Sequence, residues 1–378
     1  MPIMRDFQLD HDLERVVIDG YAFPLGIVPE DLQEPPMQGY TLDYVTGEED
    51  SPDFYSFQIT VSHERLKSLI HRVFILLPEK VSGILEIGSR DAYRSMDVFL
   101  SEVPIPQEQF LEVWKHFEPI LLEDGVIGAG ANSEEPFVEV FLDPWKGLAI
   151  HVPIAMRDEI VSLLHEEKLA EVEETWPQKS SDFLDKDLKV RPILKIDDEF
   201  SPDIDELLLT LRHAWGLELN VDPTVNTDEA GRELGYTLWH AVVIVVASGD
   251  EATETLSGSR NNAGTMGRGA EHSKGRESRE EDSEIAGGGA YCSIWATASS
   301  LDEMERLIRV TLDDFPQWRF EEMYILDRVA FDDRPEGLDF EPRRNEPEMH
   351  AIAFDPWPPT GPSVSQDEEA DENDSDVR

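Results

Sequence analysis

The sequence predicts an α+β protein made of two tandem α/β-sandwich halves of the ferredoxin-like, split βαβ type, with antiparallel sheets that carry helices on one face. Three observations predict it. Segments that alternate apolar and polar residues are interspersed with segments whose apolar residues recur at helical spacing. The order strand, helix, strand, strand, helix, strand occurs twice. The chain has 378 residues, more than one core usually supports, so we expect two domains.

The clearest signal lies in residues 290–315. Even positions from 290 to 298 are small or aliphatic and odd positions are Tyr, Ser, Trp and Thr, which is typical of a strand with one apolar face. Ser300 and Glu303 then form the pattern of a capping box, and apolar residues recur at helical spacing as far as Pro316. These residues predict a strand followed by a helix.

The remaining elements divide the chain into parts of different composition. In the first half the expected order is strand 57–61, helix 62–77, strands 83–88 and 96–100, helix 106–119, strands 126–131, 137–142 and 147–152, and helix 155–169. In the second half it is strand 192–196, helix 202–215 with Ser201 as its N-cap, strands 217–221, 236–247 and 290–298, helix 301–315, and strands 318–331 and 349–354. The apolar run within 236–247 predicts a strand that is buried on both faces.

These elements predict a domain organisation. The parts are an irregular N-terminal arm (1–54), a first α+β domain (55–170), a linker (171–190), a second α+β domain (191–355) with a disordered insertion (249–288), and a disordered Pro-rich and acidic tail (356–378). The insertion is predicted because its residues are almost all polar or glycine, which leaves too little apolar surface to offset the entropy of ordering.

The charge of the chain is its most unusual property. It has 81 acidic and 32 basic residues, a formal net charge of −49 at pH 7. Such a surface repels phosphate groups, so we expect neither nucleic acid nor a membrane as a partner. Three explanations of the acidity stay open: solubility or salt adaptation, docking of a basic protein partner, and binding of divalent cations.

Cysteine usage and hydropathy bear on the compartment. The single cysteine, Cys292, excludes an internal disulfide framework and a cysteine-based zinc site, and its place on the apolar face of its strand indicates a buried structural thiol. The N-terminus lacks the apolar core of a signal peptide, and the longest apolar run, 241–247, is too short to cross a bilayer. We therefore expect a soluble, cytoplasmic protein, whose oligomeric state the sequence leaves open.

The sequence has no motif that identifies a reaction. Phosphate-binding loops, dinucleotide-binding glycine patterns, serine-hydrolase elbows and His-Glu-x-x-His are all absent from it. We predict no cofactor and no metal site. His151 and His240 are weak polar candidates, and a structural role explains each of them as well. Trp239, Tyr291 and Trp295 lie in neighbouring predicted strands and form a candidate binding patch, unless these rings pack the interface between the halves.

The leading hypothesis is a soluble, strongly acidic, non-catalytic protein that acts by binding another protein. One alternative is a hydrolase or transferase whose site lies in the cleft between the halves and is assembled from dispersed histidines and acids. The other is a sensor that binds a small metabolite. An enzyme would place His151 or His240 beside an acid in a concave site, with a shifted pKa.

Overall fold

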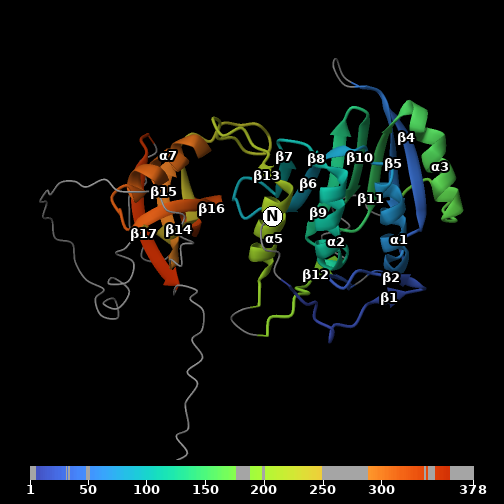
Figure 1. Ribbon diagram of the computed structural model, residues 1–378, viewed down its shortest axis with the longest axis horizontal. Coiled ribbons are helices and arrows are strands. Elements are labelled where there is room, and N and C mark those ends of the chain that lie inside the picture. Colours follow the sequence, from blue (N-terminus) through green and yellow to red (C-terminus); the bar gives the residue numbers. More distant parts are fainter. Residues whose placement is uncertain are drawn as a thin grey trace, which may run out of the picture. The chain divides into compact units, whose positions relative to one another are not determined.

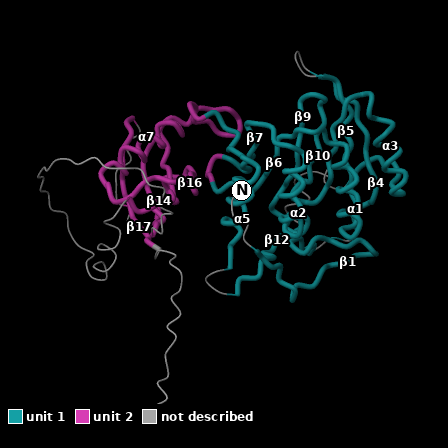
Figure 2. The backbone as a smooth tube through the Cα atoms, viewed as in Figure 1, with its two compact units in different colours: residues 1–90, 94–222 teal, residues 91–93, 223–378 magenta. Residues whose placement is uncertain are grey.

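The computed structural model describes residues 6–30, 32, 35–47, 52–175, 188–197, 201–248, 288–335, 338 and 345–357. The chain divides into two compact units: unit 1 comprises residues 1–90 and 94–222, and unit 2 comprises residues 91–93 and 223–378 (Figure 2). Most of the predicted linker, insertion and tail (171–190, 249–288 and 356–378) lies outside the described residues. Among the helices that the structure describes, none is long and apolar enough to cross a membrane.

Unit 1 is organised around a large antiparallel sheet. Its strands, in spatial order, are β13 (Leu217–Leu219), β7 (Met96–Ser101), β6 (Lys80–Gly88), β9 (Ile127–Glu134), β10 (Phe137–Leu142), β11 (Leu148–Pro153), β5 (Phe54–Thr60) and β4 (Gly39–Val45), and β8 (Ile105–Pro106) also pairs with β6. Two small ribbons are added: β1 (Val17–Ile18) with β2 (Tyr21–Ala22), and β3 (Ile27–Pro29) with β12 (Leu188–Val190).

The helices of unit 1 bury apolar stripes against this sheet. They are α1 (His63–Phe74), α2 (Gln107–Glu123), α3 (Arg157–Glu166) and α5 (Ile204–Trp215), with α2 packing on both α1 and α5 (Figure 1). The short 3-10 helix η1 (Ile154–Met156) precedes α3 and has no buried residue. Helix α5 starts at a capping box between Asp203 and Glu206 and ends at Gly216, whose φ of 64° is left-handed. The sequence predicted this helix from its apolar stripe and from Gly216, but it placed the N-cap at Ser201, two residues before the observed cap.

The mixed α/β character and the antiparallel sheets are confirmed, because every pair of named strands is antiparallel. The tandem ferredoxin-like arrangement is not confirmed. In unit 1, β10 and β11 lie between β9 and β5. Moreover, α5 and β13, which the sequence analysis placed in the second domain, belong to unit 1, since β13 pairs with β7 and the Trp215 ring stacks 4.8 Å from that of Phe110.

Unit 2 is a four-stranded sheet with one long helix. The strand order is β16 (Trp318–Val329), β14 (Thr237–Ala247), β15 (Gly289–Ala298) and β17 (Glu348–Trp357), and the helix is α7 (Leu301–Leu312), with a short 3-10 helix, η4 (Phe331–Asp333), after β16 (Figure 1). Ser300 caps α7 by accepting a hydrogen bond from the Glu303 amide at 3.2 Å. Met304, Ile308 and Leu312 of α7 bury one face of the sheet.

A buried ion pair ties residues 91–93 into unit 2. The side chains of Arg328 and Asp91 are 3% and 0% exposed, and Nε of Arg328 donates to Oδ2 of Asp91 at 2.7 Å. The guanidinium also donates to Oδ1 of Asn226 and to the carbonyl of Thr227, each at 2.7 Å. Because the guanidinium and the carboxylate both form hydrogen bonds here, the pair can be buried without leaving a charge uncompensated.

Candidate functional site

The face of the unit 2 sheet opposite α7 is the candidate site, and we call it the open face. Along β14, Ala241, Val243 and Val245 are buried under α7, whereas Val242 and Ile244 point to the open face and are half-buried. The strand is therefore not buried on both faces, as the apolar run predicted. The residues that strand pairing places on the open face are His240, Val242, Ile244 and Val246 of β14, Tyr291, Ser293, Trp295 and Thr297 of β15, Arg319, Glu322, Tyr324, Ile325 and Asp327 of β16, and Glu348, Ala351, Ala353 and Asp355 of β17.

Aromatic rings on the open face pack in pairs across neighbouring strands. The His240 ring stacks on Trp295 with centroids 4.3 Å apart and an interplanar angle of 20°. Tyr291 lies 5.5 Å from Tyr324. Paired rings on adjacent strands lose little conformational freedom when a partner covers them, so they suit a binding surface.

The histidines of this surface are neutral at neutral pH. Burial lowers the pKa of His240 and also that of His350. Nε2 of His240 lies 3.0 Å from Oγ of Ser293, and Nε2 of His350 lies 2.7 Å from Oγ1 of Thr297. Strand pairing places the carboxylates of Glu322, Asp327, Glu348 and Asp355 on the open face, together with the guanidinium of Arg319, which forms an exposed pair with Glu321 at 3.1 Å. The face is aromatic and anionic.

The structure separates the residues of the predicted patch. Tyr291 and Trp295 share the open face, and His240 joins them there. Trp239 lies on the opposite face, is 3% exposed and donates from Nε1 to the carbonyl of Ala298 at 3.2 Å. The side-chain alternation of a strand is the reason, because Trp239 is one residue away from His240. Trp239 is thus a core residue.

His151 belongs to unit 1 and has no part in the open face. It lies on β11, with Nδ1 3.0 Å from Oε1 of Glu139 on the paired strand β10. Its ring also packs 5.2 Å from Phe54. This is a cross-strand pair on a sheet surface, which a structural role explains.

Sequence reasoning missed Tyr324 and the carboxylates of β16. The pairing of β16 with β14 shifts between Val242 and Val243. It shifts again between Ile244 and Val245. The open face therefore takes Asp327 and Ile325 before the first shift, Glu322 between the two shifts and Arg319 after the second, so alternation along the sequence alone assigns Glu322 to the wrong face.

The described residues form neither a metal site nor a reactive thiol. They contain no group of three or more His, Cys, Asp and Glu side chains placed to hold a metal ion. Cys292 is buried beneath α7, and burial raises the pKa of its thiol to about 12. This keeps the thiol protonated and therefore unreactive as a nucleophile at neutral pH.

The chain matches no protein-family model, no curated protein and no solved structure. What can be said of its function therefore depends on the geometry of its own residues.

Proposed function

We propose that the protein is a non-catalytic binding protein and that a basic protein partner docks on the open face of unit 2. The observation that carries this proposal is that one sheet face combines ring pairs with carboxylates that outnumber its cationic side chain, Arg319.

Arginine and lysine are the side chains that this combination suits. A guanidinium stacks on an indole or phenol face, and such a cation–π contact contributes about 0.5–2 kcal/mol. Asp327 lies opposite His240, and Asp355 lies opposite Tyr291, so each ring pair has a carboxylate from a neighbouring strand near it. Aliphatic neighbours such as Ile244 add apolar area to the same surface.

The charge of the whole chain supports the same partner. A formal charge of −49 produces a field that accelerates the approach of a basic protein and disfavours acidic ones. Because screening shortens the range of that field, association should weaken as salt is added.

A hydrolase is the second candidate, on the strength of the contact between His240 and Ser293. A neutral imidazole 3.0 Å from a hydroxyl could act as a general base. Two features weigh against it. Ser293 lies on a central strand whose backbone amides pair with β14 and β17, so they are not free to form an oxyanion hole. Across the described residues, the hydrogen bond of His240 that we observe goes to Ser293, and no acid orients the ring.

The test is an affinity capture from the native cell with the full-length chain as bait, followed by binding measurements with the captured protein in purified form. We expect a basic protein whose affinity falls by more than about tenfold for Trp295→Ala and for Tyr291→Ala, since central aromatic residues often contribute 2 kcal/mol or more. Tyr44→Ala is the matched control, because Tyr44 is an exposed strand tyrosine of unit 1.

Two results would overturn the proposal. One is a partner whose affinity is the same at about 0.05 M and about 0.5 M salt. The other is an equal loss of affinity in the Tyr44 variant. Hydrolysis of ester or amide substrates that is lost in Ser293→Ala would establish the second candidate instead.

A further inference from the structure

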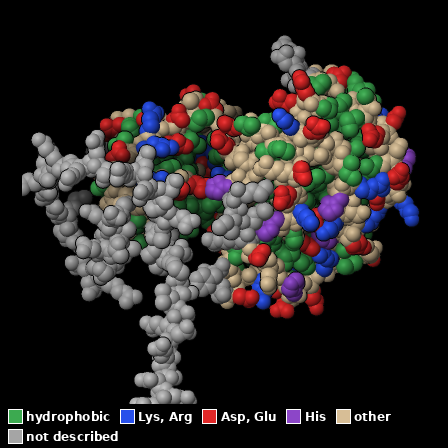
Figure 3. Space-filling model, in the orientation of Figure 1, with side chains coloured by type: hydrophobic (Ala, Val, Ile, Leu, Met, Phe, Trp, Pro, Cys, Tyr) green, Lys and Arg blue, Asp and Glu red, His purple; other side chains and the backbone are tan. Residues whose placement is uncertain are grey.

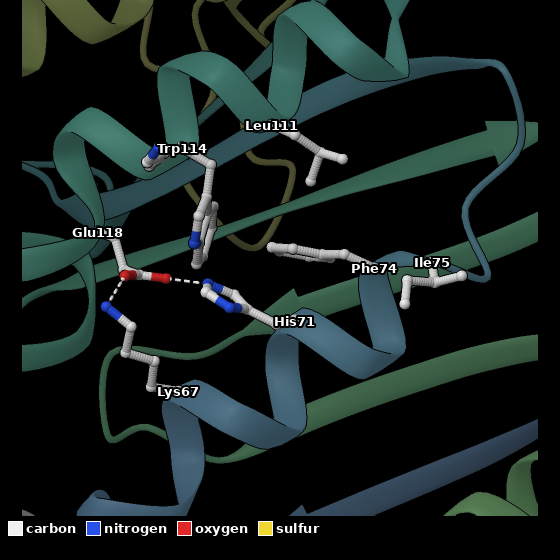
Figure 4. Close-up of a pocket in the computed structure, with 8 residues that line it drawn as sticks. Lys67, His71, Phe74, Ile75, Leu111, Trp114 and Glu118 are labelled. Atoms are coloured by element: carbon white, nitrogen blue, oxygen red, sulfur yellow. Dashed lines mark hydrogen bonds and ion pairs between the residues drawn. The ribbon is translucent and has the colours of Figure 1, made fainter.

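A pocket of about 300 Å³ opens on the surface of unit 1 between α1 and α2 (Figure 4). Each helix contributes one face to it, at the spacing of successive turns. The lining residues are Lys67, His71, Phe74 and Ile75 of α1 with its C-cap, and Leu111, Trp114, Lys115 and Glu118 of α2. The pocket is at the small end of the range for ligand sites, which suits a single ring or a short branched chain.

Trp114 gives the pocket a buried hydrogen-bond donor that is not used. The residue is 1% exposed, and its Nε1 has no hydrogen-bond partner among the described residues. The Phe74 ring packs edge-on at 4.7 Å and holds the indole in place. Figure 4 shows the nitrogen on the side of the ring that faces Glu118 and His71. An unpaired buried donor is unfavourable, so a ligand that supplies an acceptor recovers part of the lost free energy.

The charge in the pocket is opposite in sign to that of the chain. Glu118, whose side chain is 5% exposed, is neutralised by Nζ of Lys67 at 2.5 Å, and Nε2 of His71 contacts its other oxygen. Lys115 is exposed at the rim. Two lysines against one glutamate make a cationic site in a chain of net charge −49. Such a site favours an anionic ligand.

The remaining wall is apolar. Phe74 and Leu111 line it, and Ile75 is 77% exposed at its edge, so an apolar group in the pocket would remove Ile75 from water. The combined features are an apolar wall, a buried N–H donor and a cationic rim. Together they select a molecule with an apolar body and one acidic end.

We propose that this pocket binds a small amphipathic carboxylate, with the apolar body against Phe74, Leu111 and Ile75 and a carboxylate oxygen that accepts from Nε1 of Trp114. The site is independent of the function proposed above, because its lining residues all belong to unit 1 and the open face belongs to unit 2.

The test is a titration of the full-length chain, labelled with ¹⁵N in tryptophan, followed by the indole N–H signals. The probes are 3-phenylpropionate, 3-phenylpropan-1-ol and 3-phenylpropylamine, which share the apolar body and differ in the end group. We expect the carboxylate to shift the Trp114 signal saturably and the amine to bind most weakly of the three. The alcohol should bind about tenfold more weakly than the carboxylate, because a charge-assisted hydrogen bond is worth roughly 1.4 kcal/mol more than a neutral one. Trp114→Phe assigns the signal.

Surface variants keep the test decisive if Trp114→Phe fails to fold. Ile75→Asp places a negative charge at the exposed rim and should abolish carboxylate binding. Lys115→Gln should weaken carboxylate binding about threefold. Lys80→Gln is the control, because Lys80 is an exposed lysine on β6 outside the pocket, and it should leave binding unchanged. The proposal is overturned if the amine binds as tightly as the carboxylate, if only other indole signals move, or if no probe shifts the Trp114 signal at millimolar concentration.

Discussion

Arg328→Met should destabilise unit 2 far more than an ordinary surface substitution. Methionine keeps much of the volume of the side chain but removes the charge and its donors. The carboxylate of Asp91, 0% exposed, would lose both contacts from Nε, at 2.7 and 3.0 Å. Asn226 Oδ1 and the carbonyl of Thr227 would lose donors at 2.7 Å.

The magnitude follows from these losses. Removing one partner of a buried ion pair costs about 3–5 kcal/mol, and each stranded acceptor adds about 1–3 kcal/mol unless water reaches it. Asp91 keeps hydrogen bonds from the amides of Tyr93 and Arg328, each at 2.9 Å, and these limit the loss. We therefore expect a free energy of unfolding of unit 2 that is lower by about 4 kcal/mol.

Native-state amide hydrogen exchange measures this loss unit by unit. The slowest amides of β14 and β15 should exchange roughly a thousandfold faster, which corresponds to about 4 kcal/mol, whereas those of β5 and β11 in unit 1 should be unchanged. Arg319→Met is the matched control, because Arg319 lies on the same strand in an exposed pair with Glu321 at 3.1 Å, and it should cost less than about 1 kcal/mol. Equal effects of the two variants would refute the reasoning. So would an Arg328→Met effect that is undiminished in an Asp91→Ala background.

Three other predictions concern unit 1 and the start of α7. Burial opposes ionisation of Glu123, but the hydrogen bonds that its carboxylate accepts outweigh burial and lower its pKa to about 2. The carboxylate should therefore stabilise unit 1 above pH 4.5, and this stabilisation should be lost as the pH falls towards 2. Unfolding measured as a function of pH should show a flatter profile for Glu123→Gln. Gly130→Ala should cost more than about 2 kcal/mol in urea unfolding, because the added Cβ would lie 2.1 Å from the carbonyl oxygen of Val140; Gly88→Ala, which meets nothing within 4 Å, should be near neutral. Ser300→Ala should lower the melting temperature of unit 2, because it removes the N-cap hydrogen bond of α7, which contributes about 1 kcal/mol to the free energy of unfolding. An unchanged melting curve would show that Ser300 does not stabilise α7.

The sequence alone determined the elements whose signals are local. The strand β15 and the helix α7 were predicted from alternation, a cap and a following proline, because each of these acts within a few residues. The C-terminal glycine of α5, Gly216, was predicted in the same way, whereas the N-cap is Asp203 and not Ser201. Cys292 was correctly placed on the buried face, since the parity of its strand is visible in the sequence.

Only the tertiary structure decided which elements share a sheet and which side chains share a face. Helix α5 could pack on either half, and it joined unit 1 through the rings of Trp215 and Phe110, which are 105 residues apart along the chain. Two register shifts in the pairing of β16 with β14 determine which β16 side chains lie on the open face, and no local pattern marks them. Strand pairing and helix packing depend on partners far away in the sequence, and a change of one residue in register exchanges the faces of a strand. For that reason the sequence placed Trp239 in the binding patch and did not reveal the pocket around Trp114.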